Sequence, residues 1–334
     1  MKSIWRFLLP LGLLLGISAA NAGENVLTVY TYDSFSSEWG PGPKIKQLFE
    51  ERCGCKLRFV AVDSSTGILS RVRLEGRGSP ADIVLGLDTS LAGEAEKTGL
   101  LAPHGLELPA QKLPLDWRSP VFVPFDYGYF AFVYNSERTP NPPASFEALL
   151  NAPESLKIII QDPRSSTPGL GLLLWIKSIY GERAEEVWRR LAPRIVTVTK
   201  GWSEAWGLFL DGEADMVLSY TTSPAYKIIV DQEPQYHAAA FEEGHYMQIE
   251  LAAKLKNAPH PDLADRFLAF IQTPEFQSAI PTGNWMYPVI DIGDALPEAF
   301  GQLIRPAGTL LLPSAEVTAN RGAWVSEFTA ALSR

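Results

Sequence analysis

The feature that most restricts the fold of this chain is a regular alternation of β-strand and α-helix patterns. Segments rich in β-branched residues alternate with segments whose apolar residues share one helical face, as Ile45, Leu48 and Phe49 do. This alternation predicts an α/β fold with parallel strands and helices on both faces of the sheet. In the first series the predicted strands are Val26–Tyr32, Leu57–Val62 and Ile83–Leu85, and the predicted helices are Lys44–Arg52, Ile68–Glu75 and Leu91–Lys97.

A second alternating series and two long extended segments follow. The extended segments, Val121–Tyr134 and Tyr246–Ala253, have no helical period and are predicted to cross between two domains. The other predicted strands are Leu156–Ile160, Arg194–Thr199 and Met216–Tyr220, and the helices are Gly169–Tyr180, Arg183–Leu191, Ser203–Leu210, Asp262–Ile271, Pro274–Ala279 and about Ala315 to Leu332.

These patterns predict two discontinuous lobes, each with a central sheet flanked by helices, joined by two hinge strands. Lobe 1 is expected to contain residues 23–124 and about 250–295, and lobe 2 about 125–249 and about 296–334. Ligands of such sheets bind beyond the carboxyl ends of the strands, which here face the cleft between the lobes. Closure of the hinge around a ligand is the expected motion.

The first twenty-two residues have the pattern of a secretory signal peptide. Lys2 and Arg6 are followed by the apolar segment Phe7–Ile17 and by Ala20-Asn21-Ala22, a small-x-small cleavage site. The alternative is an uncleaved anchor, which the cleavage site disfavours. We therefore expect a soluble mature chain that begins at Gly23 and carries no lipid.

The charge of the chain disfavours a nucleic-acid partner. The formal net charge is −9, and removal of Lys2 and Arg6 with the signal peptide would make it −11. Nucleic-acid binding depends on neutralising phosphates, which an acidic chain does poorly. An acidic chain is compatible with a cationic ligand, although net charge does not locate a site.

The loop after Leu156–Ile160 carries hydroxyl groups at the start of the next helix. Thr167 is predicted to be the N-cap and Pro168 the first helical residue. Backbone N–H groups at a helix N-terminus, together with the Ser166 and Thr167 hydroxyls, could hold a phosphate or carboxylate. Ordinary capping is the simpler explanation of this segment taken alone.

Aromatic residues also gather where predicted strands end. Each is near glycine, serine, threonine or asparagine, which suggests a stacking site for a flat, positively charged ring. Core packing is the usual role of any single aromatic residue, so the interpretation depends on the set as a whole. The candidates are Trp202, Tyr220, Tyr226 and Trp285, with the polar residues Thr221, Thr222, Ser223 and Asn284 beside them.

The other lobe offers polar groups to the same cleft. The first strand ends at Tyr32 and Asp33, and Ser64 and Ser65 follow Asp63 after the second. An acid at this place could balance a cation or accept a hydrogen bond from an amino group. Aspartate and serine at strand ends often only cap the next element.

No catalytic or metal-binding motif is recognisable. His104, His237, His245 and His260 lie in different regions, and the chain has no Gly-x-Ser-x-Gly elbow and no P-loop. The two cysteines, Cys53 and Cys55, would form either a short local disulfide or two free thiols.

Several long segments closely resemble the bacterial periplasmic thiamine-binding family of type II solute-binding proteins. Together they span nearly all of the mature chain. They are Leu27–Phe35, Trp39–Pro43, Phe125–Tyr134, Gln161–Gly171, Val198–Ala205, Leu218–Tyr226 and Ile280–Pro288.

The resemblance implies a periplasmic binding protein that captures thiamine and its mono- and diphosphate and delivers them to an ABC permease driven by a cytoplasmic ATPase. It implies no cofactor and no catalysis, and we expect a monomer because the permease must meet both lobes. By position, Ser166, Thr167, Trp202 and Tyr220–Ser223 would line the ligand, with Tyr226 and Trp285 stacking nearby. The family carries an acid and a glycine where this chain has Ser64 and Ser65.

Two other functions remain open from the sequence. A thiaminase-like enzyme of similar fold would need a cysteine in the cleft, whereas Cys53 and Cys55 are predicted at the opposite end of their strand. A ferric-ion-binding protein of related fold would use paired tyrosines, but Tyr220 and Tyr226 are separated in the sequence.

Overall fold

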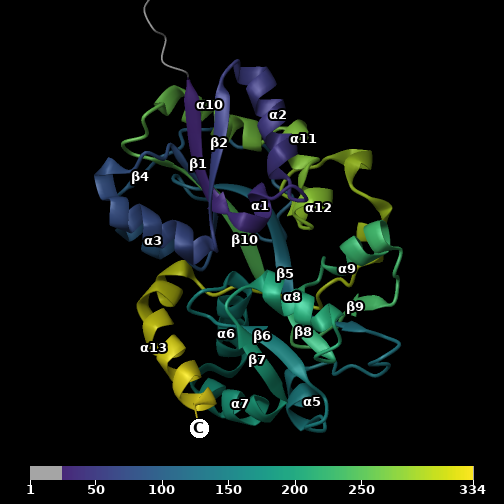
Figure 1. The fold of residues 1–334 in the computed structure, drawn as a ribbon. Helices are drawn as coiled ribbons and strands as arrows, with labels where there is room; N and C mark the ends of the chain where they lie inside the picture. The colour runs from purple at the N-terminus through teal and green to yellow at the C-terminus, as the bar shows by residue number, and fades with distance from the viewer. Residues whose placement is uncertain (1–24, 334) are drawn as a thin grey trace, which may run out of the picture.

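The computed structural model describes residues 25–333, so the predicted signal peptide lies outside the described residues. One mixed β-sheet path runs through the whole molecule in the order β2-β1-β3-β10-β5-β8-β6-β7 (Figure 1). Its strands are β1 Val26–Tyr32, β2 Lys56–Val62, β3 Ile83–Asp88, β5 Val123–Asn135, β6 Ile158–Gln161, β7 Ile195–Thr199, β8 Met216–Tyr220 and β10 His245–Leu255.

The two long strands β5 and β10 link the halves of this sheet, which confirms the predicted crossings. They pair with each other in antiparallel fashion, and Figure 1 shows them passing through the middle of the molecule. β10 is antiparallel to β3, and β5 is antiparallel to β8. The prediction of a parallel sheet is therefore wrong for the central strands. It is correct for the outer ones: β1, β2 and β3 are parallel to one another, and so are β6, β7 and β8. The reason is that β5 and β10 each continue from one half of the sheet into the other, and each therefore runs opposite to the parallel strands beside it.

The remaining elements are short strands and helices. The short strands are β4 Leu101–Ala102, β9 Tyr236–Ala238, β11 Tyr287–Pro288 and β12 Thr309–Leu310. The helices are α1 Asp33–Ser36, α2 Gly42–Cys53, α3 Ser65–Glu75, α4 Ala92–Lys97, α5 Phe146–Asn151, α6 Thr167–Tyr180, α7 Ala184–Leu191, α8 Trp202–Leu210, α9 Pro224–Tyr226, α10 Pro261–Ile271, α11 Pro274–Gln277, α12 Ile280–Gly283 and α13 Ser314–Leu332. Among the described residues no helix is long and apolar enough to cross a membrane.

Helix α6 begins one position away from the prediction. Ser166, not Thr167, is the N-cap, so Thr167 is the first helical residue and Pro168 the second. The backbone N–H groups of the first helical turn have no intrahelical acceptor, so a proline at the second position loses no hydrogen bond. The Ser166 side chain does not cap the helix.

The C-terminal helix α13 bridges the two halves of the molecule. It packs against α4 on one side and against α6 and α7 on the other. Arg321 forms an ion pair with Glu94 (3.1 Å), and Glu327 forms one with Lys177 (2.7 Å). Figure 1 shows it along the outer edge of the fold. The lobe boundaries given above stay a prediction.

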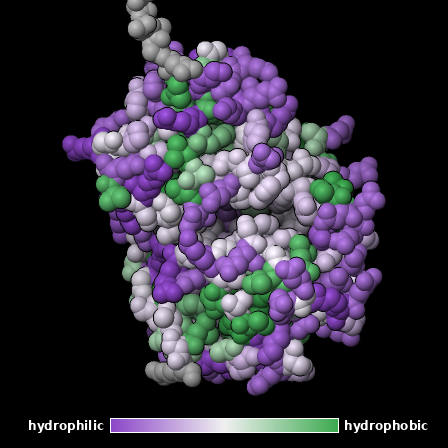
Figure 2. All heavy atoms as spheres, viewed as in Figure 1, coloured by the Kyte–Doolittle hydropathy of each residue, from purple (hydrophilic) through white to green (hydrophobic). Residues whose placement is uncertain are grey.

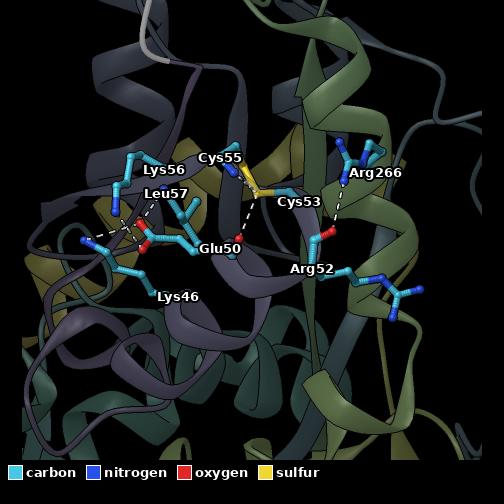
Figure 3. Close-up of a disulfide and its surroundings, with 8 residues drawn as sticks. All are labelled: Lys46, Glu50, Arg52, Cys53, Cys55, Lys56, Leu57 and Arg266. Carbon is cyan, nitrogen blue, oxygen red and sulfur yellow. Dashed lines mark hydrogen bonds and ion pairs between the residues drawn. A yellow bond between two sulfur atoms is a disulfide. The ribbon is translucent and has the colours of Figure 1, made fainter.

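The two cysteines form a disulfide that joins the end of α2 to the residue just before β2 (Figure 3). The Cα atoms of Cys53 and Cys55 are 5.1 Å apart, a separation that a disulfide spans readily. Gly54 between them has a φ of 62°, in the left-handed region that glycine adopts without a side-chain clash. The alternative of two free thiols is therefore wrong.

Candidate ligand-binding cleft

A cavity of about 700 Å³ lies between the two halves of the sheet. Figure 2 shows the middle of this face hollowed where they meet. Its wall comes from the carboxyl ends of strands in both halves, as expected for such folds. The lining residues are Tyr32, Ser34, Trp39, Asp63–Ser65, Ser165–Pro168, Gly201–Ser203, Trp206, Gly207, Leu210, Tyr220, Ser223, Tyr226, Val230, Asp231, Glu250, Thr282 and Asn284–Met286.

Most of the residues singled out from the sequence meet in this one cavity. They are Tyr32, Ser64, Ser65, Ser166, Thr167, Trp202, Tyr220, Ser223, Tyr226, Asn284 and Trp285. Their contact with a ligand stays a prediction, but segments more than two hundred residues apart in sequence, such as Tyr32 and Trp285, converge here.

Asp33, Thr221 and Thr222 do not line the cavity. Asp33 is exposed at the start of α1. Thr221 and Thr222 are fully buried, because the chain turns sharply after β8 and the Ser223 N–H bonds to the Tyr220 carbonyl at 3.1 Å. This turn places Ser223, rather than the two threonines, at the cavity wall.

One end of the cavity is suited to an anion. Helices α3, α6 and α8 all begin at its wall, and the partial positive charge of a helix N-terminus favours anions. The Thr167 hydroxyl donates to the Ser65 hydroxyl at 3.0 Å, which joins α6 to α3 across the cleft. Ser166 is only 2% exposed, and its Oγ has no hydrogen-bond partner among the described residues. A buried hydroxyl of this kind is available to a ligand atom.

Two aromatic groups supply flat apolar surfaces. The Trp202 ring stacks on Trp206, with centroids 5.5 Å apart and an interplanar angle of 17°. The Trp202 indole N–H donates to Ser219 Oγ at 2.7 Å, which fixes the ring. Trp285 meets Tyr226 edge to face at 5.2 Å. Trp285 also has a φ of 56°, a strained conformation for a bulky residue.

Buried polar groups occupy the floor of the cavity. Glu250 on β10 lines it and accepts a hydrogen bond of 2.6 Å from the Tyr32 hydroxyl. Asn284 Nδ2 lies 2.6 Å from Asp126 Oδ2 on β5 and 2.8 Å from the Tyr32 hydroxyl. Burial, followed by the charge of Glu250, raises the pKa of Tyr32 well above its usual value. Tyr32 therefore acts as a hydrogen-bond donor.

Sequence reasoning missed Glu250 and Asp126. Both lie inside strands that were predicted as crossings between lobes, and neither residue was named as a candidate for the site. The available signal was an acidic residue within an otherwise apolar and aromatic segment, because aspartate and glutamate are rarely fully buried unless they are paired.

An ion pair across the cleft mouth was missed as well. Asp63, after β2, is paired with Lys200, after β7. Together with the Thr167–Ser65 hydrogen bond, this pair joins the two walls of the cavity. Trp39, also overlooked, lines the cavity and is 57% exposed.

A thiaminase-like mechanism would need a cysteine at this site, and no cysteine lines the cavity. Cys53 and Cys55 are bonded to each other. Among the described residues there is also no group of three or more histidine, cysteine, aspartate or glutamate side chains that could hold a metal ion.

Comparisons with known proteins agree with the fold. A family described as bacterial extracellular solute-binding protein matches residues 36–278. The thiamine-binding periplasmic protein of Escherichia coli K12 is 53% identical over 324 residues, which are 97% of this chain and 98% of that protein. That of Brucella abortus is 51% identical over 320 residues, with 96% of each chain covered.

Solved structures give the same result. A periplasmic thiamin binding protein aligns with a TM-score of 0.90 and 54% identity, covering 92% of this chain and 96% of that one. A ferric binding protein from Campylobacter jejuni aligns with a TM-score of 0.76 but only 20% identity, covering 91% and 99%, so it shows the shared fold alone. The relatives at high identity are solute-binding proteins and not enzymes. The chain therefore belongs to the bacterial extracellular solute-binding protein family, within the group that contains the periplasmic thiamine-binding proteins.

Proposed function

We propose that this protein captures thiamine in the periplasm and delivers it to an ABC importer. The observation that carries the proposal is one cavity that combines rigid aromatic rings, the buried carboxyl group of Glu250 and hydroxyl-bearing helix starts. Thiamine is a flat cation with an aminopyrimidine ring, and a cation over an aromatic face gains ~0.5–2 kcal/mol. The high identity to proteins named for thiamine binding supports the same ligand.

Calorimetric titration of the mature protein with thiamine, followed by mass analysis of the recovered ligand, tests this function. A carrier binds one thiamine per chain and returns it intact. Recovery of cleaved thiamine would instead show an enzyme. Absence of binding to thiamine and to its phosphates would overturn the proposed ligand class.

We infer further that the ligand lies between two lobes, residues 23–124 with about 250–295 and about 125–249 with about 296–334. The interlobe contacts Asp63–Lys200 and Ser65–Thr167 would then hold the closed form. A monomer that presents both lobes to a membrane permease, itself coupled to a cytoplasmic ATPase, fits this arrangement. Light scattering of the purified protein checks the monomeric state.

Thiamine mono- and diphosphate are proposed as ligands of the same cavity, with the phosphate at the start of α6. Replacing Ser166 with alanine removes a hydroxyl that has no hydrogen-bond partner in the part of the chain that the structure describes. A hydrogen bond to a charged group contributes ~1.5–3 kcal/mol, so the affinity for thiamine monophosphate should fall roughly 10- to 100-fold. Thiamine itself should lose about twofold or less. Calorimetry with the two ligands measures the difference.

The matched control is Ser165→Ala. Ser165 also lines the cavity, but its hydroxyl already donates to the Lys200 carbonyl at 2.8 Å. The Ser165→Ala variant should therefore show a small and similar loss of affinity for thiamine and for thiamine monophosphate. An equal loss of thiamine and thiamine monophosphate affinity in Ser166→Ala would place the phosphate elsewhere.

A further inference from the structure

Three acidic residues form a row across the centre of the sheet. In the strand register, Glu250 of β10 lies opposite Asp88 of β3 on one side and opposite Asp126 of β5 on the other. All are buried, with exposed fractions of 6% for Glu250, 2% for Asp88 and 0% for Asp126. The row stands at the crossing between the two halves, and only Glu250 lines the cavity.

The hydrogen bonds around Glu250 and Asp126 leave these two carboxyl groups short of donors. Asn284 Nδ2 lies within 3.3 Å of Glu250 Oε2 and 2.6 Å of Asp126 Oδ2, so one amide serves both groups. Gln248 donates to Glu250 Oε1 at 2.8 Å, and Tyr32 to Oε2. Asp126 Oδ1 is buried and has no hydrogen-bond partner within residues 25–333.

No positive charge compensates these two carboxyl groups within the described part of the chain, where neither forms an ion pair. The titratable groups that face them are Tyr32 from β1, Asp88 from β3 and Tyr220 from β8, and none of these supplies a positive charge. Asp88 is held separately, by the Ser90 N–H at 2.7 Å. The positive charge that acts to lower the pKa of Asp88 belongs to Arg321 of α13, which pairs with Glu94.

Two carboxylates in this setting cannot both stay ionised at neutral pH. Burial raises the pKa of Glu250 to about 8, and burial together with the charge of Glu250 raises the pKa of Asp126 well above its usual value. Such a pair titrates as a unit, and at neutral pH it holds at least one proton. A cation brought close to the pair favours its ionised form.

We propose that the Glu250–Asp126 pair is a proton-sharing counter-charge for a cationic ligand, and that it releases a proton to solvent when the ligand enters the cleft. The carboxylic O–H bond breaks, the proton leaves to the buffer, and the remaining carboxylate balances the ligand's positive charge. No electrons are transferred. This inference rests on the proposed capture of thiamine.

The pH dependence follows from the direction of this coupling. The free pair has the raised pKa and the ligand lowers it, so protons compete with the ligand. Affinity for a cationic ligand should rise roughly tenfold per pH unit from about pH 6 toward pH 8 and level off above it. Below that range the pair stays protonated, and the ligand must enter beside neutral acids.

The test is calorimetric titration of the mature protein with thiamine at about pH 7, in two buffers of different ionisation enthalpy. The difference in apparent heat gives the number of protons released, which should be close to one per thiamine bound. A neutral analogue, with carbon in place of the quaternary thiazolium nitrogen, keeps the aminopyrimidine ring. It should bind with no proton release.

Variants locate the proton. Glu250→Gln retains groups that can bond to Tyr32 and Gln248, but it should abolish proton release and make thiamine affinity independent of pH between about 6.5 and 8.5. At about pH 8.5 its affinity should be roughly 10- to 100-fold lower than that of the unmodified protein. Asp265→Asn removes an acid outside the cavity, one paired with Lys254 of the same strand β10, and should leave proton release unchanged.

The outcomes separate this inference from the function on which it rests. If thiamine binds with no proton released, or if the neutral analogue releases as many protons as thiamine, the counter-charge role is wrong while the carrier function stands. If the proton is still released when Glu250→Gln and Asp126→Asn are combined, the pair is not its source. Failure of thiamine to bind at any pH would instead reject the proposed function.

Discussion

Replacing Trp202 with alanine should weaken thiamine binding by roughly 30- to 1,000-fold. Buried aromatic anchors in binding sites typically lose ~2–4 kcal/mol on truncation, which corresponds to that range. Trp202 is rigid before the ligand arrives, because it stacks on Trp206 and its N–H is bonded to Ser219. A pre-ordered ring loses little conformational entropy on binding. Calorimetry or quenching of tryptophan fluorescence measures the change.

The control for Trp202→Ala is Trp39→Ala. Trp39 also lines the cavity, but this residue is 57% exposed. Trp39→Ala should therefore reduce thiamine affinity less than tenfold. A Trp202→Phe variant keeps a stacking face and loses the bond to Ser219, so its affinity should lie between those of the alanine variant and the unmodified protein. Unchanged affinity in Trp202→Ala, with the thermal midpoint of the free protein preserved, would show that the ligand stacks elsewhere.

The sequence predicted the framework of this site because the framework depends on local patterns. Helix periodicity in Lys44–Arg52 and the β-branched run of Val26–Tyr32 correspond to α2 and β1 within a few residues. Glycine and proline mark the ends of elements reliably, and helices in an α/β fold begin where strands end. The convergence of strand ends on one cleft therefore follows from the order of the elements.

The sequence did not predict what a single turn does to neighbouring side chains. Thr221 and Thr222 look equivalent to Ser223 in the sequence, yet the backbone bond from Ser223 to Tyr220 buries both threonines. The acid row was missed for a related reason. Glu250 and Asp126 become neighbours only through the register of β10 on β5, which a single sequence does not specify.

The stability of the second half of the molecule should depend strongly on one buried tryptophan. Trp175 on α6 is 0% exposed and lies against Phe146 (centroids 4.8 Å apart), Phe241 (5.3 Å) and His245 (4.9 Å). Its indole N–H donates to the Gly244 carbonyl at 3.1 Å. Trp175→Ala should lower the free energy of unfolding by ~3–5 kcal/mol, because it leaves a large cavity and an unpaired carbonyl. Urea denaturation followed by circular dichroism measures this loss.

Ligand binding distinguishes a packing defect from a damaged site in Trp175→Ala. Trp175 does not line the cleft, so the variant should bind thiamine as the unmodified protein does. Thiamine at about a hundred times its Kd should therefore raise the free energy of unfolding of both proteins by ~2.7 kcal/mol. Trp39 is exposed, so Trp39→Ala should change the free energy of unfolding by about 0.5 kcal/mol or less. A loss below about 1 kcal/mol in Trp175→Ala would contradict its assigned role in the core. If thiamine stabilises the variant less than the unmodified protein, packing beneath α6 controls the position of Ser166 and Thr167 at the start of that helix. The core and the anion end of the cleft would then be energetically coupled.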